Sequence, residues 1–144
     1  MNQIEKRVLD FIAEHHIFTL ATSRDNKPYT STCFYVYLPE INLFVFTSDK
    51  NTRHIQDTEQ QHTVAGAIAL ETSIVGKIRG IQFTGIIKEL EGNELSVAQK
   101  AYIKKFPIAI LAKTTLWGIT PDFIKMTDNR LGFGKKIIWQ NQVS

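Results

Sequence analysis

The spacing of hydrophobic and polar residues predicts two helices, one at the N-terminus and one about two-thirds of the way along the chain. Near the N-terminus, apolar residues recur at i, i+4, i+7 and i+8, the spacing of one helical face. These residues are Ile4, Val8, Phe11 and Ile12. Asn2 stands three residues before Glu5, as in a capping box, so we expect this helix to begin there. The second helix is predicted over residues 93–106, and Pro107 ends it.

The other apolar segments have the composition of β-strands, with β-branched and aromatic residues between clusters of turn-forming residues. Strands are expected at residues 17–23, 29–38, 43–48, 63–70, 76–90, 115–119, 123–127 and 135–139. Short loops between the first three favour an antiparallel meander. The longest segment contains Gly80 and Gly85, which predict bulges or a sharp bend.

Together these elements predict a mainly β fold in a single domain spanning residues 1–144. The alternating βαβ spacing of a parallel sheet is missing, so we expect a small antiparallel barrel of about six strands. The helices would lie at its periphery. A polar stretch over residues 49–61 is expected to turn into a short third helix.

Composition narrows the class of protein. Hydrophobic residues make up 43% of the 144 residues and charged residues 22%, as in ordinary globular domains. Cys33 is the one cysteine, so neither an intramolecular disulfide nor a zinc site of several thiolates can form, which indicates a reducing compartment. The sequence has no apolar run of ~20 residues and no secretory leader at its start, so we expect a cytoplasmic protein without a membrane span.

The formal net charge of +3 is unevenly distributed, with −2 over residues 1–78 and +5 over residues 79–144. This charge does not require a nucleic acid partner, but it allows a local anion site. The four histidines have no metal-ligand spacing, so no metal is predicted. Cys33 has no activating motif beside it and is expected to be a small buried hydrophobic residue.

The strongest candidate for an anion site is the segment where the third strand runs into the short helix. Ser48 and Thr52 supply hydroxyl groups, and Lys50 and Arg53 supply positive charge. A helix N-terminus presents unpaired N–H groups that suit phosphate, and arginine can contact two phosphate oxygens at once. The alternative is an ordinary solvated turn with a capping residue, and the pattern alone leaves both interpretations open.

A second candidate is a lining of aromatic and amide side chains. It comprises Phe34, Tyr35, Tyr37, Gln82, Trp117 and Trp139. Gln82 interrupts an apolar strand with a group that donates and accepts hydrogen bonds, which suits the edge of a heterocycle. The alternative is that these aromatic residues belong to the core or to a subunit interface.

Four longer segments resemble a known family. They are TRHIQ at residues 52–56, IRGIQFTG at 78–85, KAYIKKFP at 100–107 and DNRLGFGKKIIW at 128–139. With them, the chain resembles the FMN-binding split barrels related to pyridoxamine 5′-phosphate oxidase, from about residue 4 to 140. The likeness is closer still to the small bacterial YhbP-like family within that group.

This resemblance implies a six-stranded antiparallel split β-barrel that forms a homodimer, with two FMN sites at the subunit interface. The positions that match the family's phosphate site are Ser48, Lys50, Thr52 and Arg53. The flavin ring is implied to lie along the second strand, at Thr32, Cys33 and Phe34. Gln82 matches a position that faces the ring or its ribityl chain.

The leading hypothesis is therefore an FMN-binding protein. Whether it also performs flavin-dependent oxidation or reduction is left open, and no catalytic residue and no substrate are assigned. The arginines and histidine that hold the substrate phosphate in pyridoxamine phosphate oxidases have no counterparts here, so pyridoxine metabolism is not indicated. One alternative is a sensor or binding protein that holds flavin or haem without catalysis. Another is a β-barrel that binds nucleic acid through its basic C-terminal half.

Overall fold

The computed structural model describes residues 2–111 and 113–142, and within them it contains seven strands and three α-helices. The strands are β1 (Ile17–Arg24), β2 (Lys27–Leu38), β3 (Leu43–Ser48), β4 (Thr63–Ala69), β5 (Arg79–Glu89), β6 (Thr115–Asp128) and β7 (Lys136–Gln140). The α-helices are α1 (Lys6–Glu14), α2 (Arg53–Gln60) and α3 (Gly92–Lys105). Short 3₁₀ turns are η1 (Val75–Lys77), η2 (Pro107–Leu111) and η3 (Asn129–Leu131).

The strands form one antiparallel sheet that closes into a barrel. Their order is β3-β2-β1-β4-β5-β6-β7, and an additional pairing of β3 with β6 closes the ring. The prediction of an antiparallel barrel is confirmed. Among the described strands, six form the closed ring. The seventh, β7, corresponds to the strand predicted at residues 135–139 and extends the sheet by pairing with the second half of β6.

The bend in β6 corrects the sequence-based assignment of two separate strands. Its first half pairs with β3, where Gly118 lies opposite Val45, and its second half pairs with β7. The register of β5 against β6 shifts between Thr84 and Gly85. A Cβ atom on Gly85 would lie 2.5 Å from the Thr120 carbonyl oxygen, so the bend requires glycine there. The bulge predicted at Gly85 is confirmed.

Gly80 behaves differently from Gly85. It pairs in regular register with Ala69 on β4 and with Thr127 on β6. The prediction of a bulge at Gly80 is therefore wrong.

Alternating side chains of the barrel strands fill its interior. Phe18 on β1 is the centre of an aromatic cluster, with ring centroids 5.3 Å from Tyr35, 5.5 Å from Phe46 and 5.8 Å from Phe83. All four rings are at most 1% exposed. A Cβ atom on Gly66 would lie 2.2 Å from the Phe83 ring, so glycine at this position makes room for the cluster.

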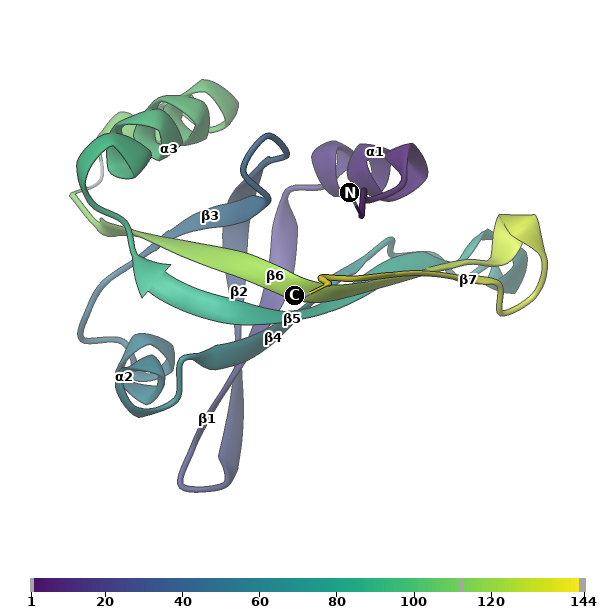
Figure 1. Cartoon of the computed structure of the whole chain (residues 1–144), viewed down its shortest axis with the longest axis horizontal. Coiled ribbons are helices and arrows are strands. Elements are labelled where there is room, and N and C mark those ends of the chain that lie inside the picture. Colours follow the sequence, from purple (N-terminus) through teal and green to yellow (C-terminus); the bar gives the residue numbers. More distant parts are fainter. Residues whose placement is uncertain (1, 112, 143–144) are drawn as a thin grey trace.

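β3 is apolar on both faces because it lies between two cores. Phe44 and Phe46 point into the barrel, while Leu43 and Val45 contact a smaller cluster beneath α3 that includes Tyr102. Figure 1 shows α3 on one side of β3 and β6, α1 near the top of the barrel and α2 near its lower edge. The helices are peripheral, as predicted. Within the described residues, none of the helices combines the length and apolar character that a membrane span requires.

The N-terminal segment joins the end of β7 rather than capping α1. Asn2 donates its side-chain amide to the Gln140 carbonyl, and Trp139 donates its indole N–H to the Asn2 carbonyl at 3.4 Å. The helix itself begins at Lys6. The predicted capping box is therefore wrong, because the Asn2 side chain has a tertiary partner.

Candidate functional site

The junction between β3 and α2 is built as a tight turn into a helix. Thr52 is the N-cap residue, and its backbone N–H and hydroxyl donate to the Asp49 carbonyl at 3.2 and 2.8 Å. The first intrahelical bond runs from the Gln56 N–H to the Thr52 carbonyl. The N–H groups of residues 53–55 therefore precede the helical ladder, and they give this end of α2 the partial positive charge that attracts anions.

Ser48, Thr52 and His54 form a compact polar cluster at this junction. The Ser48 hydroxyl lies 2.6 Å from His54 Nε2, and the Thr52 hydroxyl lies 3.4 Å from both of these atoms. Trp117 donates its indole N–H to the Ser48 carbonyl at 2.9 Å and so anchors the end of β3. Partial burial lowers the pKa of His54, and the nearby Asp57 carboxylate opposes that effect.

Two cations flank the cluster with their charged groups accessible. The Arg53 guanidinium lies over the Tyr29 ring, 4.2 Å from its centroid, and its Nε is 4.0 Å from the buried carboxylate of Asp57. Lys50 Nζ is 3.2 Å from Glu89 Oε1. The Arg53 and Lys50 side chains are 56% and 63% exposed, so each charged group is accessible from solvent.

A groove of about 550 Å³ lies beside this cluster, between α2 and the end of β5. Ile55, Ile87 and Trp117 contribute apolar surface, and Lys50 and Glu89 contribute charged side chains. Trp117 and Lys50 therefore belong both to the groove and to the surroundings of Ser48.

The second strand presents alternate residues to this region. Thr32 and Phe34 are exposed, and Phe34 is 54% exposed despite its size. Cys33 between them points into the core, where burial raises the pKa of its thiol. The contact between Arg53 and Tyr29 brings the start of α2 against β2. Thr32 and Phe34 thus offer side chains to a ligand on this strand, and Cys33 offers only its backbone.

Gln82 lies apart from this cluster within one chain. It is exposed on β5, opposite Ala67 on β4 and Lys125 on β6. Three strand steps separate β5 from β2, a distance of roughly 15 Å. The residue lines a shallow apolar groove of about 340 Å³ that also contains Thr19 and Ala65.

Most of the other predicted aromatic candidates are core residues. Tyr35 is fully buried and donates its hydroxyl to the Ile12 carbonyl at 2.6 Å. Tyr37 is half-buried and donates to the Asn42 side chain. Trp117 and Trp139 are each 8% exposed. For these residues the core interpretation is confirmed, and Phe34 remains the accessible aromatic residue of the candidate lining.

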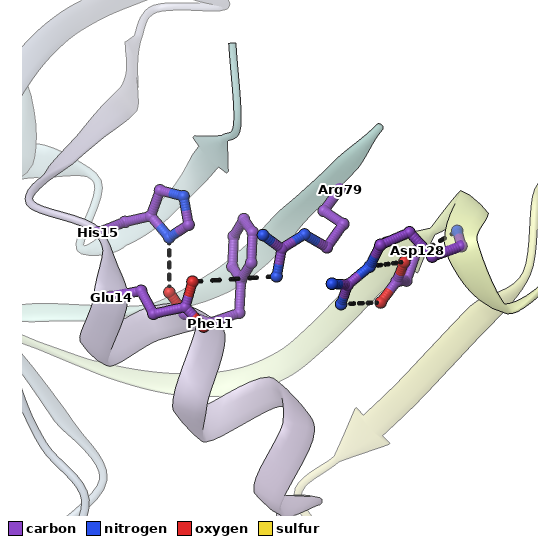
Figure 2. A network of polar contacts seen from close by, with 6 residues as sticks. Phe11, Glu14, His15, Arg79 and Asp128 are labelled. Atoms are coloured by element: carbon purple, nitrogen blue, oxygen red, sulfur yellow. Dashed lines mark hydrogen bonds and ion pairs between the residues drawn. The ribbon is translucent and has the colours of Figure 1, made fainter. Parts of the chain in front are cut away.

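Further polar contacts lie between α1, the start of β5 and the end of β6 (Figure 2). The buried carboxylate of Asp128 accepts bonds of 3.0 to 3.1 Å from the backbone N–H, Nε and Nη2 of Arg130. Arg79 lies over the Phe11 ring, 5.4 Å from its centroid, with Nη1 3.9 Å from the Glu14 carboxylate. These contacts fix the η3 turn and tie α1 to β5, so the network has a structural role.

Sequence reasoning missed the contact of His54 with Ser48. The histidines were considered only as metal ligands, and their spacing does not suit that role. The one sequence feature that could have indicated this contact is the position of His54 two residues after the N-cap of the short helix, close to the end of the preceding strand. In the described ranges 2–111 and 113–142, no three or more acidic, histidine or cysteine side chains are grouped as ligands for an ion.

The closed ring with one extra strand is the split barrel of pyridoxamine 5′-phosphate oxidase-like proteins. The chain superposes on a haem-binding protein from Mycobacterium smegmatis with a TM-score of 0.77 and 16% identity, over 95% of this chain and 59% of that one. It superposes on an FAD-binding protein from Mesorhizobium loti with a TM-score of 0.69 and 12% identity, over 88% and 95% of the two chains. At these identities the likeness concerns the fold alone.

Sequence comparison defines the family within this class. The chain is 40% identical over 130 residues to a UPF0306 protein of Klebsiella pneumoniae, covering 90% of this chain and 88% of that protein. It is 39% identical over 129 residues to the UPF0306 protein YhbP of Escherichia coli O157:H7, with the same coverage. No protein-family model matches the chain. The chain belongs to the UPF0306 (YhbP) family, as its sequence motifs predicted.

Proposed function

We propose that this protein binds FMN, with the phosphate at the β3–α2 junction and the flavin ring along the outer face of β2. The observation that carries the proposal is the contact of the Ser48 and Thr52 hydroxyl groups at the start of α2, with the accessible cations Lys50 and Arg53 in the same six-residue segment. Hydroxyl groups, free helix N–H groups and two accessible cations match the chemistry of a phosphate dianion. Names of structural neighbours support the ligand class, since one binds FAD and another binds haem.

The ring would lie against Thr32 and Phe34, whose side chains point outward from β2. An exposed phenylalanine supplies an apolar surface for an aromatic ligand. Bound FMN would supply the electron-transfer chemistry of an oxidoreductase, and the chain would contribute orientation and hydrogen bonds. Cys33 would contribute through its backbone, because its thiol lies in the core.

A homodimer would complete the site. Cross-strand register places several exposed apolar side chains, and Gln82, on the outside of the barrel. Among them are Ile17, Phe34, Ile86 and Ile138, each more than 40% exposed. Exposed apolar side chains of this kind suit an interface between two copies. Burying them would bring Gln82 of one copy toward ligand bound by the other.

The test is a titration of the purified protein with FMN, riboflavin and haemin, followed by absorbance and flavin fluorescence. We expect FMN to bind more tightly than riboflavin, because riboflavin lacks the phosphate. A protein that remains colourless and leaves FMN fluorescence unchanged would contradict the proposal. Binding of haemin in preference to both flavins would favour the haem-binding alternative. Reduction of the bound flavin by a nicotinamide donor would then test the oxidoreductase role.

A further inference from the structure

The hydroxyl groups at the β3–α2 junction have a limited supply of protons. The Thr52 hydroxyl donates its one proton to the Asp49 carbonyl at 2.8 Å, and a carbonyl can only accept. Thr52 Oγ1 therefore presents only lone pairs to Ser48 and His54. Of the Ser48 and Thr52 hydroxyl groups, Ser48 is therefore the one whose proton can be donated to an anion.

The direction of the 2.6 Å contact between Ser48 and His54 decides whether that proton is available. If His54 Nε2 is unprotonated, Ser48 donates to it and turns lone pairs toward the ligand. If Nε2 carries a proton, the imidazole donates to Ser48, and the hydroxyl proton is free for a phosphate oxygen.

We infer that His54 is the positioning residue of the anion site: a proton on its Nε2 orients the Ser48 hydroxyl toward a bound phosphate. The inference rests on the proposed function and assigns a role to a residue that the sequence pattern had not brought into the site. The same proton adds positive charge when the imidazole is fully protonated, which strengthens the attraction for a dianion.

The groups around the imidazole set how readily it takes a proton. Partial burial opposes protonation of His54, and Asp57 on the same helix favours it. Arg53, whose Nε lies 4.0 Å from Asp57, and the helix N-terminus add positive charge nearby. Lys50 and Glu89 lie beside the adjoining groove as an ion pair. Of the two strands packed against α2, β1 presents the neutral Thr22, which donates to Asp57, and β2 presents Tyr29.

Two substitutions separate this role from a loss of packing. In H54Q, the amide nitrogen can replace Nε2 as a donor to Ser48, so we expect FMN affinity within about threefold of wild type at pH 7.5. In H54N, the amide is too short to reach Ser48, so we expect affinity for FMN to fall about tenfold or more. Riboflavin affinity should be unchanged in both variants. Equal losses in H54Q and H54N, or losses shared by riboflavin, would overturn the inference.

The pH profile supplies a readout that a structural role would not move. Phosphate binding favours the protonated imidazole, so the affinity of wild type relative to H54Q should rise as pH falls from 8 to 5.5. Ionisation of the FMN phosphate, with a second pKa of about 6, affects both proteins alike and cancels in the ratio. A ratio that stays constant with pH would contradict protonation of His54 on binding.

A measurement on the wild-type chain avoids any folding defect of the variants. Histidine ¹⁵N shifts distinguish the two imidazole tautomers, and the H54Q spectrum assigns the His54 resonances. With FMN bound, Nε2 should be protonated; persistence of the tautomer protonated only at Nδ1 would overturn the inference. Wild type that binds neither FMN nor riboflavin would instead contradict the proposed function, which keeps the two failures distinct.

Discussion

Trp117 donates its indole N–H to the backbone carbonyl of Ser48 at 2.9 Å, and this bond holds the end of β3 beside the first turn of α2. The two residues lie on paired strands and are 69 positions apart in sequence. Trp117 also lines the groove next to the cluster. The position of the Ser48 hydroxyl therefore depends on a strand that contributes no direct contact to the proposed phosphate.

Replacing Trp117 with phenylalanine should loosen this anchor while keeping an aromatic ring. We expect the free energy of unfolding to fall by about 0.5–1.5 kcal/mol for the lost hydrogen bond, and FMN affinity to fall severalfold. Trp139→Phe is the matched control, because Trp139 is equally buried and its indole N–H donates to the Asn2 carbonyl. Chemical denaturation and FMN titration measure both effects. Equal FMN affinities in the two variants would show that the anchor is unrelated to binding.

Arg53 should contribute to FMN binding through its planar guanidinium. We expect Arg53→Ala to weaken FMN binding by about 1.5–3 kcal/mol, the range for hydrogen bonds to charged groups. Arg53→Lys should recover only part of the lost FMN affinity, because lysine keeps the charge but cannot contact two oxygens in parallel. Riboflavin affinity should change little in either variant, and Arg24→Ala, which removes an exposed arginine at the end of β1, should leave FMN affinity unchanged. Unchanged FMN affinity in Arg53→Ala would place the phosphate elsewhere.

The barrel was largely predictable because its strands alternate between a filled interior and an outer face. The sequence identified β3 as a strand but did not explain why its apolar residues run without interruption. In the structure, one face of β3 packs against a second core under α3. β6 was predicted as two strands because Pro121 interrupts the strand pattern. In the structure it lies at the bend, opposite Gly85, a position where a strand tolerates proline.

Local sequence could group only part of the candidate anion site. Ser48, Thr52 and Arg53 could be grouped because a strand end and a helix start place them within six residues. The contact of Ser48 with His54 depends on the conformation of the turn, and the anchor from Trp117 depends on the closure of β3 onto β6. The separation of Gln82 from the cluster follows from its place on β5, seven residues before Glu89, the residue of that strand that pairs with Lys50.

Gly85 should be essential to the bend of β6. A methyl group there would meet the Thr120 carbonyl oxygen at 2.5 Å and an Ile119 methyl group at 2.9 Å. We expect Gly85→Ala to lower the free energy of unfolding by about 1–3 kcal/mol, as overpacking does. Gly76→Ala is the control, because no other described atom lies within 4 Å of its added methyl group. Thermal or urea denaturation measures the difference, and equal stabilities of the two variants would contradict the steric requirement.

Asp128 should stabilise the fold in a pH-dependent way. Hydrogen bonds from Arg130 hold the pKa of this buried carboxyl below its ordinary value. A carboxyl with a lowered pKa in the folded state stabilises the fold fully above its unfolded pKa of about 3.9, and that contribution is lost as pH falls through the folded value. Asp128→Asn should therefore lower the free energy of unfolding by about 1–3 kcal/mol at pH 7, and the deficit relative to wild type should shrink below pH 4. Urea denaturation across pH 3 to 7 measures this deficit; a value that stays constant over the range would show that the carboxylate charge is not what stabilises the η3 turn.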